Sequence, residues 1–285
     1  MVAVADTLSF RRAAERCFVT QPALSVQVQE IESILGVQIF ERDRRRVLLT
    51  AAGREIVARG RLALAGIDDV VDIARTLCRP LSGDLRLGVI PTIASYLLPS
   101  VLPLVRQQYP ACRLLLVEDQ TAHLVRRLLD GELDVLLLAE EADLGTAKVH
   151  PLFKDEFLAV MPRSHRLARR KSIHEAELQE EAVLLLEDGH CLRDQTLGVC
   201  QSAGAEEGDF RATSLNTLVQ MVAIGVGITL LPKMAIENEL SRTTDLCALP
   251  FARPRPYRTV ALAWRPTSPR EKEFTLLGEL LRSRR

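Results

Sequence analysis

Aromatic side chains, long apolar runs and net charge are all scarce in this sequence. Phenylalanine, tyrosine and tryptophan make up 4% of its 285 residues, which argues against binding single-stranded nucleic acid on stacked rings. Apolar runs such as 135–139 are far shorter than the ~18 residues that cross a bilayer, so we expect no membrane attachment. Basic and acidic residues balance at 37 each, which argues against a protein coated everywhere by nucleic acid.

Metal-ligand spacing and a secretion signal are also missing. None of the six cysteines forms a Cys-x-x-Cys pair, and no cluster of cysteine and histidine has the spacing of a zinc site, so we expect neither metal nor cofactor. The N-terminal segment has no basic region and carries Asp6, unlike a signal peptide. We therefore expect a cytoplasmic protein with free thiols. The length suits about two domains, and a hydrophobic fraction of 47% is ample for a folded core.

The first 36 residues predict two helices joined by a tight turn. One covers 9–16, and the second begins at Thr20, a good N-cap, with Pro22 in its first turn. Gly36 is a natural end for this second helix. Its outer face carries amide and hydroxyl side chains, which can pair with base edges in the major groove of DNA. These side chains belong to Gln21, Ser25 and Gln29.

A basic hairpin follows the second helix. Strands at 38–42 and 46–49 flank a turn rich in arginine, which suits phosphates or a minor groove. The helices and the hairpin together predict a winged helix-turn-helix that binds double-stranded DNA, although each feature taken singly is more often a solvated surface. The arginines are Arg42, Arg44 and Arg45.

Residues 50–78 predict one long helix that links two domains. Thr50 is its N-cap, and its apolar positions recur at steps of three, four and seven. A single linking helix cannot bury such a stripe, so we expect a second subunit to cover it, as a DNA reader with two half-sites requires. The alternative is packing onto its own domain. The stripe consists of Ile56, Ala63, Ile67, Val70, Ala74 and Leu77.

Residues 79–83 predict a hinge, after which strands and helices alternate. This alternation is typical of an α/β domain with a largely parallel sheet, in which ligands bind beyond the carboxyl ends of the strands. Thr92, Thr121, Ser214 and the Gly189-His190-Cys191 turn lie at such places, although the hydroxyls are as compatible with plain helix capping. The expected strands cover 85–90, 112–117, 134–138, 157–161, 182–186, 228–231 and 260–263.

Cys191 has the most informative surroundings. It follows a strand at a predicted helix N-terminus, with His190 and Arg193 nearby, and both the helix dipole and positive charge favour the nucleophilic thiolate. Three nearby carboxylates act in the opposite direction: Glu187, Asp188 and Asp194.

A second cysteine, Cys200, lies nine residues later. If one helix carries both cysteines, they are ~13 Å apart along its axis and on opposite faces. A disulfide needs Cα atoms within about 7 Å, so the pair either never bridges or bridges only when the intervening segment refolds. Gly198 makes local unwinding cheaper. Two thiols that join only by rearranging the local structure would form a two-state switch.

Two parts of the sequence resemble a known family. The stretch FRRAAERCFVTQPALSVQVQEIESILGVQIFERDRRRVLLTAAG resembles the winged helix-turn-helix of LysR-type transcriptional regulators, whose effector half resembles the paired α/β subdomains of periplasmic binding proteins. LEDGHCLRDQTLGVCQSAG and FRATSLNTLVQMVAIGVGITLLP resemble the members of that family that sense hydrogen peroxide. The resemblance covers essentially the whole chain. Relative to the family pattern, the sequence starts inside the first helix and ends early.

The resemblance implies a role for each matching residue. Cys191 matches the peroxidatic cysteine, which peroxide converts to a sulfenic acid, and Cys200 matches the resolving cysteine, which condenses with it. The disulfide would reshape the effector domain and the packing of a tetramer on DNA. The residues that match polar groups around the sulfur are Thr92, Thr121, His190, Asp194 and Arg258. The residues that match DNA contacts are Thr20, Gln21, Pro22, Ser25, Gln29 and Arg42.

We therefore expect a transcriptional activator of the oxidative-stress response, not an enzyme. Its expected partners are an operator in double-stranded DNA, hydrogen peroxide, RNA polymerase and further copies of itself, as a homodimer through the linker helix and a homotetramer. Two alternatives are a LysR-type regulator that answers to a small metabolite without a thiol switch, and a thiol peroxidase. The expected divisions are a DNA-binding domain at 1–49, a linker helix at 50–78, a hinge at 79–83 and an effector domain at 84–285, with subdomain I at 84–156 and 259–285 and subdomain II at 157–258.

Overall fold

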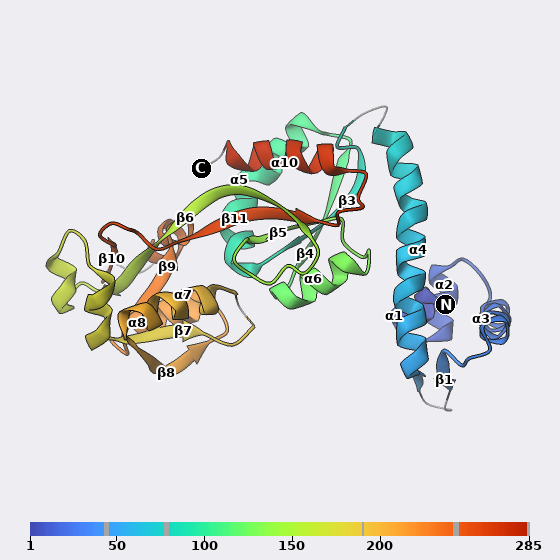
Figure 1. Ribbon diagram of the computed structural model, residues 1–285, viewed down its shortest axis with the longest axis horizontal. Coiled ribbons are helices and arrows are strands. Elements are labelled where there is room, and N and C mark those ends of the chain that lie inside the picture. The colour runs from blue at the N-terminus through green and yellow to red at the C-terminus, as the bar shows by residue number, and fades with distance from the viewer. Residues whose placement is uncertain (43–45, 77–79, 190, 242–244, 284–285) are drawn as a thin grey trace. The chain divides into compact units, whose positions relative to one another are not determined.

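The computed structural model describes residues 1–42, 46–76, 80–189, 191–241 and 245–283. The chain divides into two compact units, which Figure 1 shows in colours that run from blue at the N-terminus to red at the C-terminus. The first unit covers 1–71 with the short segment 130–132, and the second covers 72–129 and 133–285. None of the described helices is both long and apolar enough to cross a membrane.

The first unit is the predicted winged helix-turn-helix with the start of the linker helix. Ser9 and Thr20 cap their helices, because the Ser9 hydroxyl accepts from the Arg12 amide and the Thr20 hydroxyl from the Ala23 amide, both at 3.4 Å. Gly36 ends its helix in the left-handed region, with φ at +69°. The elements of this unit are α1 (Val2–Thr7), α2 (Phe10–Arg16), α3 (Gln21–Leu35), β1 (Phe40–Arg42), β2 (Val47–Leu49) and α4 (Ala51–Thr76).

A small core and two polar contacts fix α3 against the hairpin. Val4, Ala13 and Val28 are fully buried in this core. The Glu32 carboxylate accepts from the amides of Ile39 and Phe40 at 2.8 and 3.0 Å, so the end of α3 holds the start of β1. The sequence therefore presents α3 on a rigid base, as a helix that reads DNA requires.

Helix α4 leaves much of its apolar stripe uncovered. The Thr50 hydroxyl accepts from the Gly53 amide at 2.8 Å and caps the helix as predicted. Ile56 is half-buried and packs against the core of the first unit. Ile67 and Val70 are 62% and 67% exposed, and Ala63 is also exposed. The side chains of the last two stripe positions, Ala74 and Leu77, lie outside the described residues.

The second unit has two lobes that share one mixed sheet, whose strand order is β10-β6-β11-β5-β3-β4, with β9 also pairing with β6. Lobe I contains β3 (Gly83–Val89), α5 (Pro91–Gln108), β4 (Cys112–Glu118), α6 (Thr121–Leu129), β5 (Val135–Ala139), β11 (Tyr257–Trp264) and α10 (Glu271–Arg282). Lobe II contains η1 (Arg166–Arg169), η2 (Glu175–Glu180), β7 (Ala182–Leu186), α7 (Cys191–Ala203), β8 (Glu206–Ala212), α8 (Leu215–Ala223), β9 (Thr229–Pro232), α9 (Lys233–Leu240) and β10 (Leu246–Pro250).

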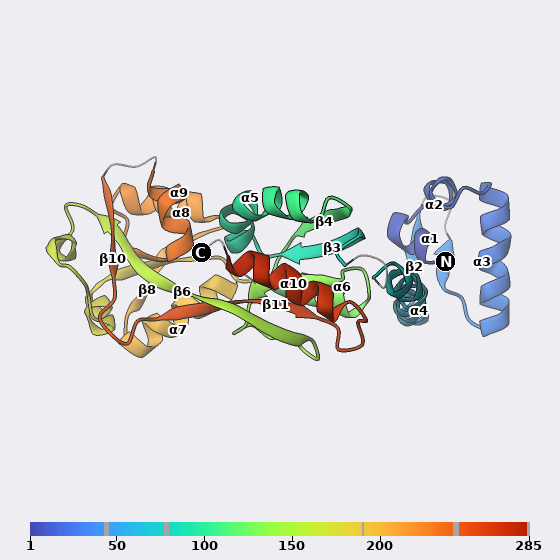
Figure 2. The same cartoon turned by 90° about the horizontal axis from the view of Figure 1, so that it is seen from above.

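Strand β6 (Lys148–Pro162) runs through both lobes, as Figures 1 and 2 show. Its first part pairs with β11 in lobe I, and its last part pairs with β9 and β10 in lobe II. All these pairings are antiparallel, as is that of β11 with β5, whereas β3 pairs in parallel with β4 and β5. The prediction of a largely parallel sheet is therefore wrong, because long antiparallel strands connect the lobes.

Each lobe has its own hydrophobic core. The core of lobe I gathers the fully buried strand β5 with α5, α6 and α10. The core of lobe II gathers β7, α8 and β9. Cys191 belongs to the core of lobe I, although α7 is an element of lobe II, and Cys200 belongs to the core of lobe II. Helix α7 therefore places one thiol in each core.

Gly53 provides a test of how the hairpin is held against α4. A Cβ at Gly53 would lie 2.1 Å from the carbonyl oxygen of Ile39, so Gly53→Ala must push the backbone of the hairpin away. We expect it to lower the free energy of unfolding by about 1–3 kcal/mol. Gly66→Ala on the same helix is the matched control, because its Cβ meets nothing within 4 Å. The control should increase the free energy of unfolding by up to about 1 kcal/mol. Urea unfolding followed by circular dichroism measures both values. Equal effects of the two substitutions would refute this packing.

Candidate functional site

Cys191 is the first residue of α7 and is buried, with 9% of its surface exposed. The turn before it contains Gly189, whose φ of +92° is a conformation that glycine adopts most readily. Burial raises the pKa of this thiol above its ordinary value, and the amide of Leu192, in the first turn of α7, offsets a small part of that increase. Strand β7, the turn and the start of α7 all belong to lobe II. They position the thiol so that it packs in the core of lobe I.

Thr121 faces the thiol from lobe I. It is the first residue of α6, and its hydroxyl interacts with the sulfur and lowers the pKa of Cys191. The Thr121 hydroxyl oxygen is buried and has no partner at hydrogen-bond distance among the described residues. An unsatisfied buried hydroxyl costs free energy, so this hydroxyl is available to a small molecule that reaches the sulfur.

Arg258 brings a positive charge to the same place. This β11 side chain is fully buried, pairs with Asp155 at 3.1 Å, and lowers the pKa of Cys191. Its guanidinium also donates to both the hydroxyl and the carbonyl oxygen of Thr92, each at 2.9 Å. Because the Thr92 oxygen accepts from Arg258, its own proton is directed to another acceptor.

A small cavity lies beside the sulfur. It has about 180 Å³ that no atom fills, but in the resting structure it is too narrow to hold a water molecule. Four of its lining residues are buried and three are at least partly exposed, so the space is closed on the inside and borders the surface at the other three residues. Ile90, Pro91, Thr92, Gln120, Thr121, Gly189 and Cys191 line it.

Burial raises the pKa of the Cys191 thiol above its ordinary value, and the partners described above offset this only in part. The helix start and the positive charge therefore do not outweigh burial in the resting state. Burial also raises the pKa of Cys200, to about 11, and the charge of Glu207 acts in the same direction. Both cysteines are free thiols.

Arg193 does not supply the charge that the sequence suggested. It is buried and directed into lobe II, where it pairs with Asp188 at 2.7 Å and Glu207 at 2.8 Å. Residues two apart on a helix project about 200° from each other, so Arg193 points away from the cysteine. Asp194 is exposed, and its charge raises the pKa of Cys191.

The structure brings several predicted residues together. Thr92, Thr121 and Arg258 surround Cys191, while His190 lies outside the described residues. Ser214 instead caps α8 by accepting from the Thr217 amide, which is the plain capping role. Two further residues of the site were not predicted from the sequence: Asp155, which fixes Arg258, and Gln120, which precedes Thr121.

The predicted DNA-binding residues lie on and beside α3. Thr20, Gln21, Pro22 and Gln29 are exposed, and Ser25 is half-buried. Arg42 ends β1, but its side chain, like all of Arg44 and Arg45, lies outside the described residues.

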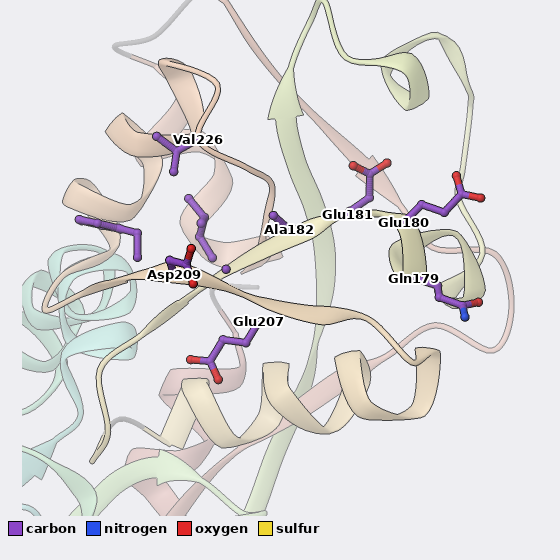
Figure 3. A pocket seen from close by; sticks show the side chains of 10 residues that line it. Gln179, Glu180, Glu181, Ala182, Glu207, Asp209 and Val226 are labelled. Atoms are coloured by element: carbon purple, nitrogen blue, oxygen red, sulfur yellow. The ribbon is translucent and has the colours of Figure 1, made fainter.

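A larger hollow lies over the β7–β8 sheet (Figure 3). Its labelled carboxylates do not converge on one point, and two of them already hold partners, because Glu181 binds His165 and Arg166 while Glu207 binds Arg193 and Arg211. Within the described part of the chain, no group of three or more histidine, cysteine, aspartate or glutamate residues is placed to hold a metal ion.

Comparisons with known proteins match both parts of the chain. The family model for the bacterial regulatory helix-turn-helix protein of the lysR family matches residues 1–54, and that for the LysR substrate binding domain matches residues 79–285. The DNA-binding transcriptional dual regulator OxyR of Escherichia coli K12 is 42% identical over 285 residues, which are 100% of this chain and 93% of that protein.

Two solved structures share the predicted architecture, in which a winged helix-turn-helix precedes a two-lobed α/β domain. A full-length Pseudomonas aeruginosa OxyR with a cysteine replaced by aspartate has a TM-score of 0.84 and 36% identity, covering 99% of this chain and 92% of that one. A cysteine-to-serine mutant of Corynebacterium glutamicum OxyR with hydrogen peroxide bound has a TM-score of 0.72 and 34% identity. The match covers 99% of this chain and 89% of that one. Because both family models match and the identity extends over the whole length, the chain belongs to the LysR family of bacterial helix-turn-helix regulators.

Proposed function

We propose that the protein is a transcriptional regulator of the oxidative-stress response that senses hydrogen peroxide through Cys191. One observation carries the proposal: a buried thiol shares a small cavity with the Thr121 hydroxyl and with a Thr92 hydroxyl that Arg258 orients. Hydrogen peroxide has two O–H groups and four lone pairs, so it can both donate to and accept from such hydroxyls. The Escherichia coli, Pseudomonas aeruginosa and Corynebacterium glutamicum relatives support the same assignment.

The first chemical step oxidises Cys191. The thiol loses its proton, and the thiolate attacks one oxygen of hydrogen peroxide. A sulfur–oxygen bond forms, the oxygen–oxygen bond breaks, and the sulfur loses two electrons. The other oxygen leaves as hydroxide and takes up a proton, so the products are a sulfenic acid and water. Arg258 favours the thiolate that attacks, and the two threonine hydroxyls hold the peroxide and donate to the departing oxygen.

The second step joins Cys191 to Cys200 and rearranges α7. The Cys200 thiol loses its proton and the thiolate attacks the sulfenic sulfur. The sulfur–sulfur bond forms, the sulfur–oxygen bond breaks, and the hydroxide that leaves takes up a proton and becomes water. On the intact helix the two residues are ~13 Å apart along the axis, whereas a disulfide needs Cα atoms within about 7 Å. The segment between them must unwind, and both thiols must leave their separate cores. Gly198, which is exposed within α7, lowers the cost of that unwinding.

The first unit delivers the signal to DNA. In this proposal α3 enters the major groove with Gln21, Ser25 and Gln29, and the wing contacts phosphates through Arg42, Arg44 and Arg45. The exposed stripe of α4 is covered by the α4 of a second subunit, and the dimers form a tetramer. The regulator acts as an activator with RNA polymerase. Since its target is chromosomal DNA, the proposal places it in the cytoplasm.

The switch uses peroxide stoichiometrically, so the protein is a sensor and not a thiol peroxidase. The alternative is a LysR-type regulator that answers to a small metabolite and has no thiol switch. We favour the thiol switch because the space beside Cys191 is small and two threonines line it, whereas a metabolite site is larger.

Mass spectrometry after treatment with less than one equivalent of peroxide tests the thiol switch. We expect a disulfide selectively between Cys191 and Cys200, because only Cys191 has the peroxide-holding hydroxyls. Cys191→Ser should abolish the response and leave DNA affinity measurable. Cys200→Ser should accumulate the sulfenic acid without a lasting switch. Cys247→Ser, which changes a half-buried cysteine of β10, is the control and should behave as the unaltered protein. Absence of the bridge would favour the metabolite-responsive regulator.

The pH dependence of the first step follows from the raised pKa of Cys191. Below that pKa the thiolate fraction grows about tenfold for each pH unit, so the oxidation rate should grow similarly. Since burial raises the pKa above the ordinary value, we expect the rate still to increase at a pH of about 9. Stopped-flow measurements with the Cys200→Ser protein isolate this step. A rate that becomes constant below pH 7 would mean that the pKa is lowered instead.

A further inference from the structure

We propose that Gln120 is the residue that determines which hydroperoxides reach Cys191, because its carboxamide closes the rim of the cavity and admits hydrogen peroxide but not bulky organic hydroperoxides. This inference rests on the proposed function and adds to it a selectivity for the size of the substrate. It arises from the burial pattern of the cavity and from one close approach across its rim.

The residues around the cavity fall into two groups. Ile90, Thr92 and Thr121 are buried like Cys191 itself and form the interior. Pro91 and Gln120 are half-buried and Gly189 is exposed, so these three form the rim. Of these three described residues, Gln120 carries the longest side chain at the rim.

The side chain of Gln120 lies directly on Gly189. A Cβ built on Gly189 would meet the Gln120 Oε1, Cδ and Nε2 atoms at 2.6, 2.9 and 3.0 Å. The carboxamide thus occupies the volume that a side chain at 189 would need. Gly189 also has a φ of +92°, a conformation that strains other side chains whatever the space around them. The contact joins the start of α6 in lobe I to the turn before α7 in lobe II.

The backbone of Gln120 is fixed while its side chain spans the rim. Its amide donates to the Asp119 carboxylate at 2.8 Å, and its carbonyl oxygen accepts from the Leu124 amide at 3.0 Å as α6 begins. The position of the carboxamide therefore depends on the side-chain torsions of one residue. Hydrogen peroxide is small and can hydrogen-bond to the carboxamide as it passes. An alkyl or aryl hydroperoxide carries a carbon group that needs the volume the carboxamide fills.

The test compares two variants in the full-length Cys200→Ser protein, which reports the first oxidation alone. Gln120→Ala removes the carboxamide, and Gln120→Met keeps a side chain of similar length as a matched control. The measurement is the second-order rate constant of Cys191 oxidation by hydrogen peroxide and by cumene hydroperoxide. We expect the ratio of the cumene rate to the hydrogen peroxide rate to increase at least tenfold in Gln120→Ala and less than threefold in Gln120→Met.

The outcomes separate the selectivity from the proposed function. A parent protein that does not react with hydrogen peroxide at all would overturn both. A parent that reacts, with an unchanged rate ratio in Gln120→Ala, would overturn the role of Gln120 alone. An equal increase in the Ala and Met variants would also overturn it, because the effect would then not depend on the size of the side chain.

A double-mutant cycle tests the close approach itself. Gly189→Ala should displace the Gln120 carboxamide and change the rate ratio by more than threefold. The same substitution in the Gln120→Ala protein has no carboxamide to displace, so its effect on the ratio should fall below twofold. The backbone strain at position 189 is common to both backgrounds and cancels in the comparison. Equal effects in the two backgrounds would contradict the contact.

Discussion

The separation of two sulfurs along one helix is the constraint on which the proposed switch depends. Nine residues place Cys191 and Cys200 on opposite faces of α7, and each face is buried in a different core. No rotation of side chains can bring sulfurs together across that distance, so a disulfide and an intact α7 exclude each other. Oxidation can therefore switch α7 between two conformations, and a structural signal requires two such states.

Burial has the largest effect on the pKa of the Cys191 thiol in the resting protein. The raised pKa of Cys191 keeps most of the thiol protonated near neutral pH, so thiol reagents that depend only on a free thiolate react slowly. In the proposed mechanism, Arg258 and the threonines act only on a molecule small enough to reach the sulfur. Arg258 is itself held by Asp155, and removal of one partner of such a buried ion pair costs about 3–5 kcal/mol. The charge at the sulfur is therefore fixed before peroxide arrives.

The sequence allowed the local elements to be predicted but not the contacts between distant segments. The cap at Thr20, the stop at Gly36 and the helix that carries both cysteines each follow from neighbouring residues, whereas Ser9 was placed inside its helix and in the structure caps it. Strand β6 was recognised only at 157–161, because charged residues such as Lys154 and Asp155 interrupt the apolar pattern of its first part. A strand that connects two lobes packs against a different surface at each end. No single alternation of apolar and polar residues therefore describes its whole length.

The candidate site shows the same limit. Thr92 and Thr121 could be found as hydroxyls at the ends of strands, yet sequence proximity favoured Arg193 as the positive partner of the thiol. Helical geometry turns Arg193 away, and the charge comes from Arg258 on a strand far along the chain. Gln120 carried no signal of its own, since its importance arises from the absence of a Cβ at Gly189 on the other lobe.

Hydrogen exchange of the α7 amides before and after stoichiometric peroxide is the most direct test of the switch. The account predicts that amides between Cys191 and Cys200 are protected in the reduced protein and lose that protection when the disulfide forms, while the amides of β5 in lobe I keep theirs. A disulfide between the two cysteines with undiminished protection across α7 would contradict it.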